Sequence, residues 1–172
     1  CWRKYLPLSL KEYYCFQQWN FSVDQNGRLN LDELSHKIRD DTILVSLMYV
    51  NNEVGIINPI HEVREIISQK NKKTKFHVDM VQALGKIPID LSVVDMASFS
   101  AHKIYGLKGS GVLFKKESTS LIPLICGGQQ ESGLRGGTSN TATHIMFAKT
   151  LRLALENQDN KYQYVKSLNR YV

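Results

Sequence analysis

The chain has 172 residues, of which 42% are hydrophobic and 22% are charged, as in an ordinary globular domain with a substantial core. No segment contains the ~18 consecutive apolar residues that a membrane-spanning helix needs, so we expect no membrane association. The net charge of +6 is modest, and the scattered basic residues do not form the basic and aromatic pattern of a nucleic-acid module. We therefore expect no direct contact with nucleic acid.

The three cysteines, Cys1, Cys15 and Cys126, are too few and too irregularly spaced for a disulfide framework or a zinc site. They favour a reducing compartment, and we expect a cytoplasmic protein without a bound metal. The chain begins with Cys1 rather than Met, and residues 160–172 have helical composition without a stop signal. We therefore expect a piece of a longer protein.

The first predicted elements lie in residues 1–34. Residues 1–20 are difficult to place, and we expect them to be helical in part. Residues 21–34, FSVDQNGRLNLDEL, carry oxygen-bearing side chains at the spacing of a calcium-binding EF-hand loop. However, Ser22 replaces the first carboxylate, and the sequence has no second loop of this kind. The segment favours a strand, a turn at Asn26-Gly27 and a helix that is capped near Asn30.

The middle of the chain alternates strands and helices. The apolar run TILVSLMYV, residues 42–50, is typical of a strand that is buried on both faces of a parallel sheet. A helix is expected from Pro59 to about Lys72, and another from about Asn140 to Asn157. Further extended segments are expected at 75–80, 87–91, 93–100 and 112–115. This order predicts an α/β fold with a mostly parallel sheet.

Polar side chains follow three of the predicted strands. They are Asn52 and Glu53, then Asp79 and Gln82, and finally Ser100, His102 and Lys103. Because the carboxyl ends of parallel strands share one edge of a sheet, we expect these groups to converge. A lysine taken alone is most often a solvated surface residue. Beside the other polar groups at these strand ends, however, the amine of Lys103 can form a Schiff base with an aldehyde cofactor.

The chemistry of the set matches pyridoxal 5'-phosphate. An aspartate can hold the pyridine nitrogen protonated, and amides can bond a ring oxygen. Serine and histidine can bind the phosphate. The segment Gly127–Asn140 is either a flexible surface loop or a backbone nest that presents Thr138 to an anion. The loop GLKGSG lacks the spacing of a P-loop, and SAHKIYG is not the nucleophile elbow of a serine hydrolase.

Four motifs carry a family resemblance. MYVNNEVGIINPI, FHVDMVQALGKIPIDL, SFSAHKIYGLKGSGVLF and GGQQESGLRGGT resemble, in this order, the motifs of the NifS/IscS-type cysteine desulfurases, which are pyridoxal-phosphate enzymes of the class V aminotransferase superfamily. The resemblance covers about Val23 to Asn157. It implies a three-layer α/β fold, the large domain of fold-type I transferases, with residues 1–172 as one domain that is its central part.

The resemblance implies a reaction. L-cysteine would be converted to L-alanine, with the sulfur delivered as a persulfide to a sulfur acceptor or an iron–sulfur scaffold protein. Lys103 would be the Schiff-base lysine that also moves the Cα proton, and Asp79 would pair with the pyridine nitrogen. The family's nucleophilic cysteine matches none of the three cysteines, and we expect Cys126 to be a small buried residue before a turn.

The remaining cofactor contacts also follow from the resemblance. Gln82 and Asn52 would lie at the ring oxygen, and Ser100 and His102 would bind the phosphate. Thr138 would reach the phosphate of the neighbouring subunit in a homodimer. The alternatives are a selenocysteine lyase, another class V aminotransferase-like enzyme, or a non-catalytic remnant of the fold.

Overall fold

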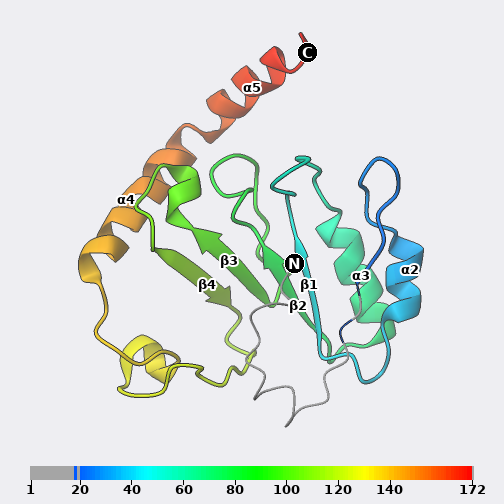
Figure 1. Ribbon diagram of the computed structural model, residues 1–172, viewed down its shortest axis with the longest axis horizontal. Coiled ribbons are helices and arrows are strands. Elements are labelled where there is room, and N and C mark those ends of the chain that lie inside the picture. Colours follow the sequence, from blue (N-terminus) through cyan, green and yellow to red (C-terminus); the bar gives the residue numbers. More distant parts are fainter. Residues whose placement is uncertain (1–17, 19, 172) are drawn as a thin grey trace.

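The computed structural model describes residue 18 and residues 20–171 (Figure 1). The partly helical segment that we expect within residues 1–20 therefore lies outside the described residues, except for positions 18 and 20. The described part of the chain contains a four-stranded sheet and several helices, and the extended segment that we expect at 87–91 is not one of its strands.

Four strands form the sheet: β1 (Leu44–Met48), β2 (Lys75–Asp79), β3 (Met96–Ser100) and β4 (Gly111–Lys115). Their order across the sheet is β1-β2-β3-β4. The first three strands are parallel, so that Met48 lies beside Asp79 and Asp79 lies beside Ser98. β4 runs antiparallel to β3. The predicted mostly parallel sheet is therefore confirmed.

The two faces of the sheet differ in character because side chains alternate along each strand. One face carries buried apolar residues, among them Val45, Phe76, Val78 and Ala97. We call the opposite face the polar face, and it carries Ser46, His77, Asp79, Ser98 and Ser100. The period-2 pattern thus gathers most polar side chains of the sheet on one face, which also carries the apolar Leu44, Met48 and Met96.

Two helices supply the other half of the core. They are α2 (Leu31–Lys37) and α3 (Ile60–Lys70), and α3 is the crossover between β1 and β2. Ile60, Val63 and Ile67 of α3 are fully buried in one cluster with Phe76 and Val78. The apolar stripe of α3 therefore anchors the apolar face of the sheet, as the helical spacing predicts.

The prediction that β1 is buried on both faces is wrong. Val45 is buried, but Leu44, which projects from the opposite face, is 47% exposed. The physical reason is topological: β1 is the outer strand of the four, and its second face is not covered by any element that the structure describes.

The segment that resembles an EF-hand loop is a turn followed by a capped helix. Val23 pairs with Leu29 across the turn, and the Asp24 carboxylate accepts hydrogen bonds from the backbone of Asn26 and Arg28, both at 2.8 Å. Asn30 Oδ1 accepts from the backbone of Glu33 at 3.0 Å and caps α2. The predicted turn and cap are confirmed, since these oxygens bond to the backbone.

The last third of the chain contains a glycine-rich loop and two helices, α4 (Thr141–Glu156) and α5 (Gln158–Leu168). Phe147 and Ala154 of α4 pack against Leu84 and Ile104 in a second apolar cluster. No residue of α5 is buried, and Figure 1 shows this helix extending away from the sheet. None of the described helices is both long and apolar enough to cross a membrane.

Candidate functional site

The parallel arrangement brings three strand ends to one edge of the sheet. Asp79 is the last residue of β2 and Ser100 is the last residue of β3. His102 and Lys103 follow β3 in a 3-10 turn, η1 (Ala101–Ile104), and both are exposed. Asn52 lies in the turn after β1, and Gln82 in the turn after β2. The expected grouping at one edge is thus present for six of the seven candidate residues.

Asp79 is oriented by its own turn. Its Oδ1 accepts a hydrogen bond from the backbone of Val81 at 3.0 Å, and its carbonyl oxygen accepts from the backbone of Tyr49 at 2.9 Å. No described residue donates a hydrogen bond to Oδ2. One carboxylate oxygen therefore fixes the side chain, and the other is available to a ligand that donates a proton.

The end of β3 presents three polar groups in four residues. Ser100 Oγ lies 2.6 Å from His102 Nδ1, so the hydroxyl and the imidazole orient each other. The Nε2 atom of His102 has no partner among the described residues. One proton is used in this contact, so the pair keeps either the serine O–H or the imidazole Nε2–H to donate to an anion such as a phosphate.

A tight turn holds Lys103 close to the strand end. Tyr105 adopts the left-handed conformation (φ 68°), and Gly106 N donates to Ala101 O at 2.9 Å. A Cβ atom on Gly106 would lie 2.8 Å from Ala101 Cβ and 2.9 Å from Ala101 O. Backbone atoms cannot move aside easily, so this close approach requires glycine.

The two asparagines after β1 have different tasks. Asn51 Oδ1 accepts from the backbone of Glu53 and Val54, both at 2.9 Å, and so stabilises the turn. Asn52 is exposed and makes no side-chain hydrogen bond to a described residue. Its amide is therefore available to a ligand, as the sequence analysis expects.

A second lysine lies close to the first. Lys86 Nζ donates to Gln82 Oε1 at 2.9 Å. Burial lowers the pKa of Lys86, and the positive charge of nearby Lys103 lowers it further. Lys86 is not among the residues that we expect at the site from the sequence. Its position four residues after Gln82 nevertheless indicates that the two side chains can meet in a turn of helix-like geometry.

The helix α5 also borders this edge. Lys161 Nζ lies 5.8 Å from the centroid of the Tyr105 ring, close enough for a cation–π contact. A cavity of about 390 Å³ between α5 and the turn after β2 is lined by Tyr49, Lys86, Tyr162 and other residues. The segment that follows α4 therefore contributes to the surroundings of the candidate site.

Thr138 does not join the other six residues within the chain. Because β4 is antiparallel, the loop that follows it leaves from the opposite edge of the sheet. Figure 1 shows this loop in yellow, below the sheet, whereas η1 lies above it near α4. Thr138 is exposed there, at the edge of the sheet opposite the other six candidate residues.

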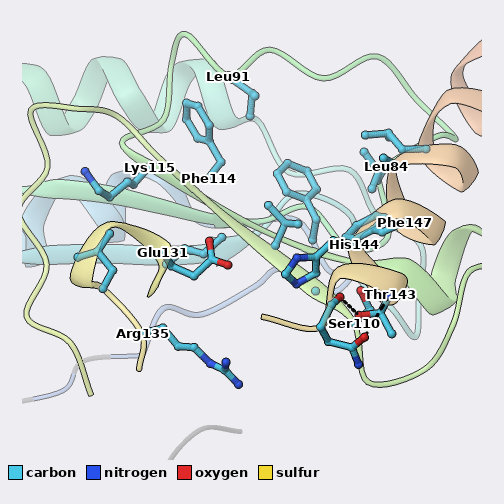
Figure 2. A pocket seen from close by; sticks show the side chains of 18 of the residues that line it. Leu84, Leu91, Ser110, Phe114, Lys115, Glu131, Arg135, Thr143, His144 and Phe147 are labelled. Atoms are coloured by element: carbon cyan, nitrogen blue, oxygen red, sulfur yellow. Dashed lines mark hydrogen bonds between the residues drawn. The ribbon is translucent and has the colours of Figure 1, made fainter. Parts of the chain in front are cut away.

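Thr138 instead lines a cavity of about 1450 Å³. Figure 2 shows its apolar wall, which includes Leu84, Phe114 and Phe147, and the charged groups Glu131 and Arg135 from the glycine-rich loop. None of the other six candidate residues lines it. The size of this cavity therefore does not identify the site.

The prediction for Cys126 is wrong. We expected a small buried residue, but Cys126 is exposed, and its thiol lies 3.7 Å from Pro123 O. The reason is its place in the long connection after β4, where no described element covers it. Like Thr138, it lies at the edge of the sheet opposite Lys103.

The chain is similar to known proteins in both sequence and structure. The profile of the Aminotransferase class-V family matches residues 16–171. A NifS/IcsS protein homolog of Lactobacillus delbrueckii subsp. bulgaricus is 44% identical over 164 residues, which are 91% of this chain and 42% of the relative. A cysteine desulfurase IscS of Clostridium botulinum is 42% identical over 148 residues, which are 85% of this chain and 37% of the relative.

A solved structure titled NIFS-LIKE PROTEIN superposes with a TM-score of 0.89 at 42% identity and covers 95% of this chain and 45% of its own. This match confirms the predicted fold class of the NifS-like transferases. The chain spans less than half the length of these curated relatives. On the family profile and the identity to both relatives, the chain belongs to the aminotransferase class-V family.

Proposed function

We propose that this chain is the central part of the pyridoxal-phosphate-binding large domain of a cysteine desulfurase, which converts L-cysteine to L-alanine and passes the sulfur on as a persulfide. The observation that carries the proposal is the meeting of Lys103, Asp79 and the Ser100–His102 pair at adjoining strand ends. The similarity to a cysteine desulfurase over 85% of the chain supports the same conclusion.

The donors and acceptors at this edge fit the cofactor. Asp79 offers a carboxylate oxygen that no described residue uses, which suits a pyridine N–H. The Ser100–His102 pair offers a donor for a phosphate, and the exposed amine of Lys103 suits an aldehyde. When bound, pyridoxal phosphate supplies an electron sink for the breaking of a Cα–H bond.

The candidate residues at this edge then divide the tasks of holding the cofactor and moving a proton. Asp79 would hold the pyridine nitrogen of the cofactor, and Asn52 and Gln82 would donate hydrogen bonds to its ring oxygen. Lys103 would hold the cofactor through its aldehyde, and its amine would be the base that accepts the Cα proton of the substrate.

The sulfur-accepting thiol has no candidate among the described residues. Within one chain, Cys126 lies at the opposite edge of the sheet from Lys103. We therefore assign the persulfide to a cysteine of another segment or chain. We further propose a cytoplasmic homodimer in which Thr138 of one subunit contacts the phosphate of the other, and which hands sulfur to an acceptor such as an iron–sulfur scaffold protein.

The test is to mix the protein with pyridoxal phosphate, reduce with borohydride and locate the fixed cofactor by peptide mass mapping. We expect the label on Lys103, and Lys103→Ala should abolish it. Lys108→Ala is the matched control, since Lys108 is an exposed lysine of the same loop. A label on Lys86 or Lys108 in the parent protein would refute the assignment. Release of alanine with sulfide, rather than of a keto acid, distinguishes a desulfurase from an aminotransferase.

A further inference from the structure

Three polar residues of the polar face have no task in the proposed function: Ser46, His77 and Ser98. Ser46 lies beside His77 in the register of β1 and β2, and Ser98 lies beside Asp79 in the register of β2 and β3. Because residues two apart on a strand share a face, His77 and Asp79 project from the same face of β2. The three residues form a row across the parallel strands, directly behind the candidate site.

Both ring nitrogens of His77 are hydrogen-bonded. Nδ1 lies 2.7 Å from Ser46 Oγ, and Nε2 lies 2.8 Å from Ser98 Oγ. A hydroxyl group can donate or accept, so a neutral imidazole satisfies both contacts, with one nitrogen donating and the other accepting. The row therefore fixes the plane of the ring without needing a charge on it.

Few charged groups face His77. Lys75 and Asp79 flank it on β2, and Lys115 of β4 lies one strand farther, beside Met96. Strands β1 and β3 contribute no charged side chain. Burial lowers the pKa of His77, and this effect outweighs the opposing influence of the Asp79 carboxylate. The imidazole is therefore neutral at pH 7.

A neutral neighbour matters to Asp79. A protonated His77 would attract the carboxylate that, in the proposed function, holds the proton on the pyridine nitrogen. We propose that His77, held between Ser46 and Ser98, is a positioning residue for Asp79. It fixes the strand that ends in Asp79 and leaves the whole charge of that carboxylate to the cofactor. This inference rests on the proposed function, because it concerns the same site.

The first measurement uses the parent protein with ¹⁵N-labelled histidine and no cofactor. We expect the ring nitrogens of His77 to report one fixed neutral tautomer at about pH 7.5 and to titrate at a lower pH than the same ring in urea-unfolded protein, which should titrate near pH ~6.5. Titration of His77 in the folded protein at the ordinary value would overturn the proposal, whatever any variant does.

The second measurement is the dissociation constant of pyridoxal phosphate. His77→Leu removes both hydrogen bonds and should weaken binding about tenfold. His77→Gln keeps a donor and an acceptor and should restore most of the affinity. His61→Leu, on the exposed side of α3, is the matched control and should bind like the parent.

The outcomes separate the two proposals. If the parent does not bind pyridoxal phosphate at Lys103, the proposed function fails and this inference fails with it. If the parent binds and a folded His77→Leu binds equally well, this inference alone is refuted. If His77→Leu and His77→Gln weaken the binding of pyridoxal phosphate equally, this inference is also refuted, because the loss of affinity would then not come from the lost hydrogen bonds.

Discussion

The buried carboxylate of Asp95 ties together the elements that support the candidate site. Asp95 is only 6% exposed. Its Oδ2 accepts a hydrogen bond from Phe76 N at 2.8 Å and lies 3.1 Å from Arg64 Nη2. Its backbone bonds to Phe76 O at 2.8 Å and to Lys116 N at 2.9 Å. This one residue therefore connects α3, β2, the start of β3 and the end of β4.

Asp95→Ala should destabilise the fold strongly. The substitution leaves the Arg64 guanidinium without its carboxylate and the Phe76 N–H without an acceptor. Removal of one partner of a buried ion pair costs about 3–5 kcal/mol. Because the Arg64 side chain is 25% exposed, water recovers part of this loss, and we expect about 3 kcal/mol. Asp95→Asn keeps an oxygen for Phe76 N, so it should cost only about 1–2 kcal/mol.

The assay is urea unfolding followed by far-ultraviolet circular dichroism. Asp41→Ala is the control, because Asp41 pairs with Arg39 on the surface and such pairs contribute about 1 kcal/mol or less. The double variant of Asp95 and Arg64 should cost less than the sum of the two single variants. If Asp95→Ala stays within about 0.5 kcal/mol of the parent, the buried pair does not stabilise the sheet as argued here.

Three further predictions follow from the structure. Asp79→Ala should weaken the binding of pyridoxal phosphate, measured by fluorescence, by about tenfold or more, whereas Asp24→Ala should leave it unchanged. Gly106→Ala should lower the free energy of unfolding by about 1–3 kcal/mol, because its Cβ would meet the Ala101 backbone, and a neutral result in urea unfolding would show that the turn can adjust. The lowered pKa of His77 means that the unfolded chain binds a proton more readily than the folded one, so the stability that His77 contributes is present above about pH 6.5 and is lost as the pH falls. Urea unfolding at about pH 7.5 and pH 5.5 should therefore show a smaller difference in His77→Gln than in the parent.

Much of the fold could be predicted because the decisive signals are local. The stripe of Ile60, Val63 and Ile67 sets the buried side of α3, and the caps Asn30 and Asn140 mark where α2 and α4 begin. The grouping of Asp79 with Ser100 and Lys103 followed from topology alone, since parallel strands end at one edge. The assignment of a cofactor to these residues remains a proposal.

The features that could not be predicted from the sequence depend on contacts between distant parts of the chain, which no local pattern encodes. The run that includes Leu44 predicts an apolar strand, but burial also requires a neighbour on each face, and only the fold decides that. The same holds for His77. Ser46 precedes it by 31 residues and Ser98 follows it by 21, and they meet it only through the register of the sheet.

A shift of either pairing by one residue would move a serine to the apolar face and leave a ring nitrogen without a partner. The strand register therefore determines which side chains surround Asp79. A variant that disturbs the start of β3, such as Asp95→Ala, should weaken cofactor binding through His77 as well as destabilise the fold. Loss of stability without any loss of affinity for pyridoxal phosphate would separate the two effects and argue against this coupling.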